Sequence, residues 1–209
     1  MNVIEAVIFD YGGVISTSPP LSVREDLAAL AGIPVEKLNK ADRACRREYD
    51  RGRFDTAGYY HYLAKEAGIH ADEETILKMA RIDTDSWKNF NPATLELMED
   101  IKAKGFKLGI LSNMPFDFLD WLKTELPVFH KVDLALFSCE LALIKPENKI
   151  YEVLAERLGC NFENIVFFDD MRENIDAARA LGIRGFVWKN VEEARLELQK
   201  LEPERFQGR

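Results

Sequence analysis

The sequence predicts an α/β fold, a doubly wound parallel sheet of about five strands with a small all-helical cap inserted after the first strand. Three observations lead to this prediction. A short apolar run stands near the start of the chain, and from residue 92 onward similar runs alternate with helical segments. Between residues 16 and 90 no comparable run occurs. The alternation indicates a sheet covered by helices on both faces, and the middle segment indicates a helical insertion.

The first strand is predicted over residues 4–9, IEAVIF, because this run is rich in aliphatic residues and stops at Asp10 and the Gly12–Gly13 pair. Four later runs have the same character. They predict strands over residues 106–111, 132–138, 164–168 and 183–188.

Helices are predicted between and after these strands, over residues 91–105, 116–126, 147–159, 172–182 and 191–201. Pro92 suits the first turn of a helix. Three glycines suit the left-handed residue that ends one: Gly105, Gly159 and Gly182. The tail after residue 201 is expected to be exposed or frayed.

The middle segment is predicted to form four helices, near residues 21–31, 35–51, 56–67 and 73–82. We therefore expect a core domain of residues 1–15 and 91–209 and a cap domain of residues 16–90. One face of helix 35–51 is apolar, and the other side carries Arg43, Arg46, Arg47 and Arg51. Such a stripe either faces solvent or lets one arginine reach an anionic or polyhydroxyl part of a substrate. Trp87, near the return to the core, either lines the cleft or fills the hinge.

Polar side chains follow three of the predicted strands. Asp10 ends the first, Ser112 follows the second, and Asp169 with Asp170 follows the fourth. The carboxyl ends of parallel strands meet at one edge of the sheet, so we expect these groups together, with Lys145 nearby. Three carboxylates in one crevice repel one another, and a hard divalent cation with oxygen ligands is the usual remedy. Mg²⁺ is therefore the expected ion.

This combination suits the spread negative charge of a transferring phosphoryl group, with Asp10 as the attacking nucleophile. Each residue also has a plain structural interpretation. The aspartates suit turns or helix caps, Ser112 suits an ordinary strand end, and Lys145 suits a surface lysine before a proline.

Four segments in this order resemble the motifs of the haloacid dehalogenase superfamily: FDYGGV, LSN, IKPENKIY and FFDDMRENIDAARALG. The last is similar to the sugar-phosphate phosphatases and to the phosphatase domain of soluble epoxide hydrolases. The resemblance implies a Rossmann-like core, with Asp10, Ser112 and Lys145 as catalytic residues. It implies substrate phosphate contacts from Tyr11, Gly12, Ser112, Asn113 and Lys145. It also implies Mg²⁺ ligands from Asp10, the backbone carbonyl of Gly12, Asp170, and Asp169 directly or through water.

Gly12 departs from the pattern of most phosphatases in that superfamily, which carry a second aspartate there as general acid and base. Losing such a group typically costs roughly 10² to 10⁴ in rate. The family's metal ligand at this position is a backbone carbonyl, which glycine keeps, and some relatives similar to bacterial glucose-1-phosphate phosphatases also have glycine.

The expected function is therefore Mg²⁺-dependent hydrolysis of small phosphorylated metabolites, sugar phosphates first, through an aspartyl-phosphate. Two alternatives use the same aspartate, a metal-independent 2-haloacid dehalogenase and a phosphomutase. The acidic pair disfavours the first, and Gly12 disfavours the second. A third alternative is a phosphate-binding or regulatory protein with low turnover.

Composition limits the partners. The formal net charge of −8 disfavours nucleic acid or an anionic membrane, whereas a small-molecule phosphate ester suits a locally cationic site. The three cysteines, Cys45, Cys139 and Cys160, indicate neither a disulfide framework nor a zinc site, so a reducing cytoplasm is expected. Neither a secretory signal nor a membrane span is expected. The oligomeric state has no sequence signal.

Overall fold

The structure, a computed structural model, describes residues 3–206 and contains a five-stranded, all-parallel sheet with the order β3-β2-β1-β4-β5. The strands are β1 (Ala6–Phe9), β2 (Lys107–Ser112), β3 (Leu134–Phe137), β4 (Ile165–Asp169) and β5 (Arg184–Val187). The predicted fold class is confirmed. The first strand is shorter than predicted and begins at Ala6.

The chain direction places a crevice at the end of β1. From β1 the chain builds outward through β2 and β3, and it then crosses back to place β4 and β5 on the other side. Phe9 pairs with Ile110 on one side and with Phe168 on the other. Where the winding direction reverses, the connections leaving the strands diverge, and binding sites form there.

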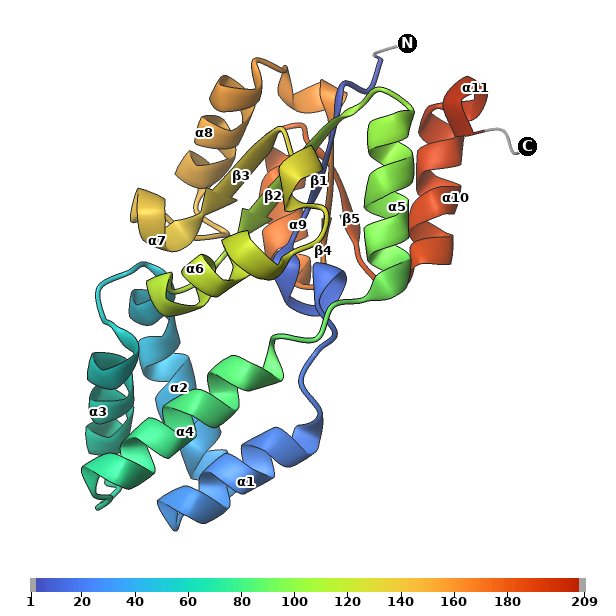
Figure 1. Cartoon of the computed structure of the whole chain (residues 1–209). Coiled ribbons are helices and arrows are strands. Elements are labelled where there is room, and N and C mark those ends of the chain that lie inside the picture. Colours follow the sequence, from blue (N-terminus) through green and yellow to red (C-terminus); the bar gives the residue numbers. More distant parts are fainter. Residues whose placement is uncertain (1–2, 207–209) are drawn as a thin grey trace.

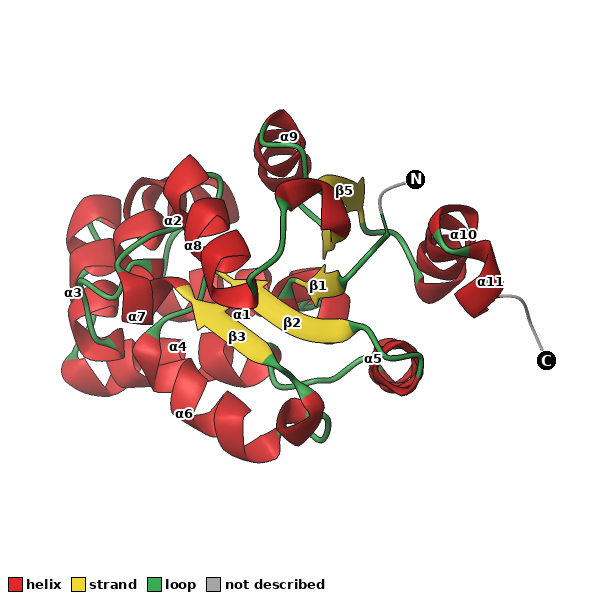
Figure 2. Ribbon diagram, turned by 90° about the horizontal axis from the view of Figure 1, so that it is seen from above, coloured by secondary structure: helices red, strands yellow, loops and turns green. Residues whose placement is uncertain are grey.

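Helices cover both faces of the sheet, as the view from above shows (Figure 2). One face packs on α5 (Pro92–Ala103), α6 (Phe116–Glu125) and α10 (Val191–Leu201), and the other on α8 (Asn148–Leu158) and α9 (Arg172–Ala180). Successive strand residues alternate between these cores. Phe9 and Phe168 join the first core, while Ile8 and Phe167 join the second, as the two-residue period of a strand requires.

Four helices form a separate layer beyond the end of the sheet: α1 (Leu21–Ala31), α2 (Val35–Asp50), α3 (Thr56–Ala67) and α4 (Glu73–Ser86) (Figure 1). They share a hydrophobic core of their own, and α4 continues four residues beyond its predicted end at 82. The side chains of Asp55 and Asp72 cap α3 and α4 by accepting hydrogen bonds from Gly58 and Thr75. The exact boundaries of core and cap domains stay a prediction.

Two antiparallel segments connect this layer to the sheet. Thr17 donates its backbone N–H to the carbonyl of Asn89 at 2.8 Å, and Asn91 donates to the carbonyl of Ile15 at 2.8 Å. Short elements complete the chain: a π-helical turn (Tyr11–Ile15), 3₁₀ turns (Phe129–Lys131 and Phe162–Asn164), α7 (Ser138–Leu141) and α11 (Pro203–Phe206).

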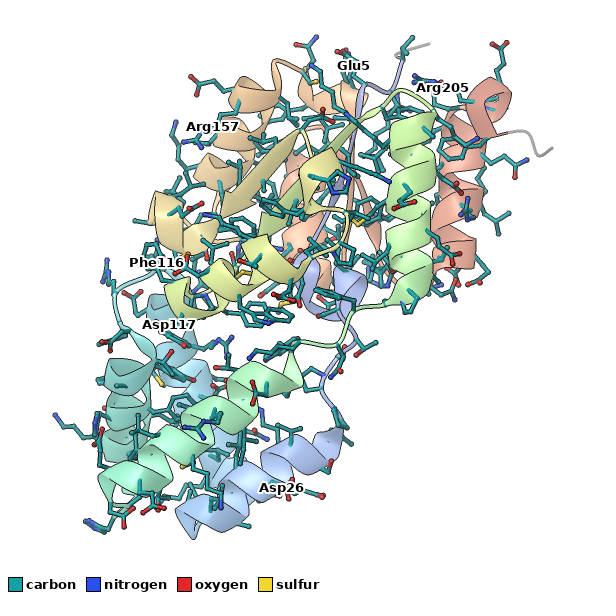
Figure 3. The ribbon with its side chains drawn as sticks, viewed as in Figure 1. Glu5, Asp26, Phe116, Asp117, Arg157 and Arg205 are labelled. Atoms are coloured by element: carbon teal, nitrogen blue, oxygen red, sulfur yellow. The ribbon has the colours of Figure 1, made fainter. Side chains whose placement is uncertain are left out.

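The end of the chain differs from our prediction. Gly105, Gly159 and Gly182 have the expected positive φ values of 81°, 62° and 99°. Up to residue 206 the tail forms α11 and is not frayed, although Pro203 and Glu204 are exposed as predicted. Phe206 stacks on Phe106 with ring centroids 5.6 Å apart, and the guanidinium of Arg205 lies 3.7 Å from the Phe106 centroid. Figure 3 labels Arg205 at this end of the core. Aromatic burial holds this last turn in place; residues 207–209 lie outside the described part of the chain.

Within residues 3–206, we find no helix that combines the length and the apolar character needed to cross a membrane.

Candidate active site

Asp10 and Lys145 form the centre of a buried ionic cluster at the carboxyl end of the sheet. Asp10 follows β1 and is only 7% exposed. The Nζ atom of Lys145 lies 2.8 Å from Oδ1 of Asp10 and 2.6 Å from Oδ2 of Asp169. It also donates to the carbonyl of Leu111 at 2.9 Å. All three donor positions of the ammonium group are therefore directed at strand ends.

Asn113 holds the backbone of Lys145 in place. Its Nδ2 donates to the carbonyl of Lys145 at 3.0 Å, and its Oδ1 accepts from the Lys145 N–H at 2.8 Å. The sequence predicted Asn113 as a substrate contact, whereas the structure engages its amide with the main chain of Lys145. Asn113 still borders the cavity described below.

Three carboxylates meet at this edge. Ligand oxygens of Asp10, Asp169 and Asp170 all lie within 4.8 Å of one another. Asp169 is fully buried, and its oxygens accept from Lys145, from Nδ2 of Asn174 at 3.0 Å and from the N–H of Met171 at 2.8 Å. Asp170 is exposed and borders the cavity. The two members of the acidic pair thus differ: Asp169 faces its protein donors, and Asp170 faces open space.

Burial raises the pKa of Asp10 to about 7, with Lys145 opposing the rise and Asp169 adding to it. Although Asp170 is exposed, the surrounding walls of the cavity partly desolvate it, and this desolvation, followed by the charge of Asp169, raises its pKa. Burial alone would lower the pKa of Lys145, but Asp10 and Asp169 raise it. One ammonium therefore offsets three carboxylates only in part, and the all-oxygen donor set fits a hard divalent cation such as Mg²⁺.

The turn after Asp10 shapes this edge. Gly13 has φ +69°, and a Cβ atom there would lie 2.8 Å from Oδ2 of Asp170, so the position requires glycine. Gly12 has φ −65° and ψ 125°, which any residue adopts. A Cβ atom at Gly12 would instead lie 3.3 Å from Cζ3 of Trp87. The Trp87 ring occupies the space in front of Gly12.

Tyr11 links this turn to the cap. Its backbone N–H donates to Oδ1 of Asp10 at 2.7 Å, and its hydroxyl donates to the carbonyl of Trp87 at 2.7 Å. Its ring packs against Phe118, with centroids 5.4 Å apart. Trp87 is therefore held beside the residue that follows Asp10.

A cavity of about 420 Å³ lies between the sheet edge and the cap. Its core side is lined by the residues predicted from the strand ends: Asp10, Tyr11, Gly12, Ser112, Asn113, Lys145 and Asp170. Asp169 lies beneath them. Of the four arginines predicted on helix 35–51, Arg46 borders the cavity, whereas Arg51, which follows α2, pairs with Glu147 of the core at 2.6 Å.

The sequence did not single out four charged cap residues that line the same cavity: Arg24, Asp42, Asp50 and Asp83. Each stands in a polar stretch of a helix, where a solvent-facing position is the usual interpretation. No local pattern distinguishes such a residue from one that the packing of three helices turns toward a cavity.

Two characterised proteins are similar to this chain in sequence over most of its length. The chain is 25% identical over 192 residues to phosphatase MT3486 of Mycobacterium tuberculosis, a match covering 88% of this chain and 87% of that protein. It is 21% identical over 192 residues to the (S)-2-haloacid dehalogenase of Pseudomonas putida, covering 87% and 83%.

Among solved structures, the fold resembles the HAD family enzyme BT-2542 of Bacteroides thetaiotaomicron, crystallised as a magnesium complex. The TM-score is 0.73 at 19% identity, over 89% of this chain and 93% of that one. The family model of the haloacid dehalogenase-like hydrolases matches residues 4–182. This range includes Asp10, Ser112, Lys145, Asp169 and Asp170. The protein therefore belongs to the haloacid dehalogenase-like hydrolases.

Proposed function

We propose that this hydrolase is a Mg²⁺-dependent phosphatase that cleaves small phosphate monoesters through an aspartyl-phosphate on Asp10. One observation carries the proposal: Asp10, Asp169 and Asp170 gather within 4.8 Å around a buried lysine at the floor of a cavity. A metal-binding group of oxygens beside an ammonium suits a phosphoryl group, whose transfer depends on positioning and charge stabilisation.

The residues divide the work as follows. The free oxygen of Asp10 attacks phosphorus while the bond from phosphorus to the leaving-group oxygen breaks, and water later hydrolyses the acyl phosphate. Ser112 donates to the non-bridging oxygens, and Lys145, whose three donors are held by the strand ends, offsets the charge of those oxygens. Tyr11 holds the other carboxylate oxygen of Asp10 through its backbone N–H. Asp169, held by Asn174, orients Lys145 and keeps it charged.

Asp10, Asp170 and the carbonyl of Gly12 would hold Mg²⁺, with Asp169 contributing directly or through water. When bound, the cation supplies charge neutralisation between Asp10 and the incoming phosphate. This assignment is supported by the donor set and by the exposure of Asp170 to the cavity.

Small phosphorylated metabolites, with sugar phosphates first, are the proposed substrates. The cavity volume of about 420 Å³ suits a molecule of that size, and its cap side offers both hydrogen-bond donors and acceptors. A phosphatase among the relatives supports the same class of reaction. We propose a reducing cytoplasm as its location, in keeping with three buried free cysteines.

The direct test is a Mg²⁺ titration of phosphatase activity, with acetyl phosphate and p-nitrophenyl phosphate as substrates and Asp10→Asn as the control. Activity should rise with Mg²⁺, disappear after chelation and be absent in Asp10→Asn, while the circular dichroism spectrum is unchanged. Substantial phosphatase activity in Asp10→Asn would assign the reaction to another residue.

A metal-independent 2-haloacid dehalogenase is the second candidate, because Gly12 provides no acid and a dehalogenase is among the relatives. The two functions separate cleanly. Halide release from (S)-2-chloropropionate that persists in EDTA, together with inert phosphate esters, would favour the dehalogenase.

A further inference from the structure

The cap side of the cavity carries five charged side chains that the proposed reaction does not use. Arg24 comes from α1, Asp83 from α4, and the other three, Asp42, Arg46 and Asp50, from α2. We propose that these five residues, the cap cluster, bind a neutral, hydroxyl-bearing leaving group and exclude a second anionic group. This inference rests on the proposed function and names the substrate class of the same site.

Arg46 is the centre of the cap cluster. Its Nε lies 2.9 Å from Oδ1 of Asp50, and its Nη1 lies 3.4 Å from Oδ2 of Asp83. The guanidinium carbon lies 5.5 Å from the ring centroid of Tyr49, which also borders the cavity. Arg46 is thus held between two carboxylates and a ring, and it is not free to turn toward an incoming anion.

Asp42 and Arg24 form the second part of the cluster. Nη2 of Arg24 lies 3.0 Å from Oδ2 of Asp42, and the hydroxyl of Tyr59 donates to the other carboxylate oxygen. Both arginines of the cap cluster are therefore already neutralised by carboxylates of the same wall.

The charge count gives the direction of selectivity. Three carboxylates face two guanidinium groups, so the cap cluster carries no net positive charge even with one carboxyl protonated. At the opposite end of the cavity, Lys145 and a divalent cation at the proposed site would together balance the three carboxylates of Asp10, Asp169 and Asp170, and the cation would offer its positive charge directly to a phosphate. A phosphate is attracted to that end, whereas a second phosphate at the cap end would meet the surplus carboxylate.

Hydroxyl groups, by contrast, match the cap cluster. Carboxylate oxygens accept hydrogen bonds from hydroxyls, and guanidinium N–H groups donate to them. The side chains of Asp50 and Asp83 are 13% and 10% exposed, so a bound hydroxyl completes their solvation at small cost. The inferred substrate is a phosphate monoester with a polyhydroxyl body and one anionic end.

The experiment compares kcat/KM for cleavage of the primary phosphate in three substrates: glucose 6-phosphate, glucose 1,6-bisphosphate with glucose 1-phosphate measured as the product, and hexyl phosphate. The parent enzyme should prefer glucose 6-phosphate to both others. In Asp50→Asn/Asp83→Asn, Arg46 loses both carboxylate partners and becomes able to bind an anion. The preference over the bisphosphate should then fall by roughly 10- to 100-fold, as expected for removing like charges several ångströms away.

Asp26→Asn is the matched control, because Asp26 is an exposed aspartate of α1 on the cap surface (Figure 3). It should leave all three ratios unchanged. If the double variant fails to fold, Asp83→Asn alone should lower the same ratio in the same direction.

The outcomes separate the two proposals. A parent enzyme that cleaves neither the phosphate esters nor acetyl phosphate overturns the proposed function. A parent that cleaves them without preferring glucose 6-phosphate over the bisphosphate overturns the role of the cap cluster. A ratio that stays constant in a folded double variant does the same, because a cluster that merely stabilises the cap would change stability and not selectivity.

Discussion

Replacing Gly12 by aspartate tests the chemistry and the packing of the site in one variant. The chain lacks an acid at this position, and a positioned general acid contributes typically 10² to 10⁴ in rate. We therefore expect the parent enzyme to cleave aryl and acyl phosphates much faster than alkyl phosphates. Gly12→Asp should raise turnover on the poor leaving groups if the new carboxyl finds room.

The structure determines how much stability the protein loses when aspartate replaces Gly12. Because φ at Gly12 is −65°, the backbone accepts aspartate without strain. Replacing glycine also reduces the conformational freedom of the unfolded chain, which stabilises the folded protein by about 0.4–1 kcal/mol. The new Cβ would lie 3.3 Å from Cζ3 of Trp87, and overpacking of this kind costs about 1–3 kcal/mol. The net loss is about 0–2.6 kcal/mol, which lowers Tm by up to about 10 °C for a chain of this size.

Trp87 therefore decides how much activity the substitution restores. In Gly12→Asp/Trp87→Ala, the ring that fills the space in front of residue 12 is removed, while the hydrogen bond from Tyr11 to the backbone carbonyl of residue 87 remains available. We expect the double variant to gain more on alkyl phosphates than the product of the two single effects.

The assay is a leaving-group series, from aryl phosphates of increasing leaving-group pKa to an alkyl phosphate, measured on the parent and the three variants with Tm recorded for each. A parent with brisk alkyl phosphate hydrolysis and a flat leaving-group dependence would contradict the missing-acid argument. The proton would then come from substrate, water or a cap residue. A Gly12→Asp variant that melts above the parent would contradict the packing argument.

Three further substitutions test the proposed metal ligand Asp170, the buried Lys145, and the ion pair between Glu147 and Arg51. Asp170→Asn should weaken Mg²⁺ binding roughly tenfold or more in calorimetric titration, since a carboxylate ligand is lost, while exposed Asp176→Asn should not; equal affinities would exclude Asp170 as a ligand. Lys145→Met leaves buried carboxylates without their counter-ion and should destabilise by about 3–5 kcal/mol in urea unfolding, with Mg²⁺ restoring part of the loss; a loss below about 1 kcal/mol would contradict this. Glu147→Gln breaks the ion pair with Arg51 that joins cap and core, and should raise KM a few-fold at constant kcat with a stability change of only about 0.2–1 kcal/mol. The hydrogen bond from Arg51 lowers the pKa of Glu147. The ion pair of the parent therefore contributes fully to stability above the ordinary glutamate pKa, and this contribution is lost as the pH falls through the lowered pKa. A difference in stability between parent and variant that persists in strong acid would argue against this pair.

Much of this fold is encoded in short stretches of sequence. The apolar run ending at Asp10, the glycines that end helices, and the alternation after residue 92 each act within a few residues, because backbone conformation and burial period are local properties. The same local signals placed Ser112 and the acidic pair at strand ends. A parallel sheet brings its strand ends to one edge, so their meeting in one cavity follows from the pattern.

Contacts between separate elements have no such signal. Trp87 lies over Gly12 from a distant part of the chain, and Arg46 meets Asp83 across two helices. The last turn is held by Phe206 stacking on Phe106, although its sequence resembles a solvated tail. These contacts arise from the angle and register at which whole elements pack, which depend on the summed burial of many side chains. The location of the proposed active site can therefore be predicted along the chain, whereas the cap wall of the cavity requires the assembled molecule.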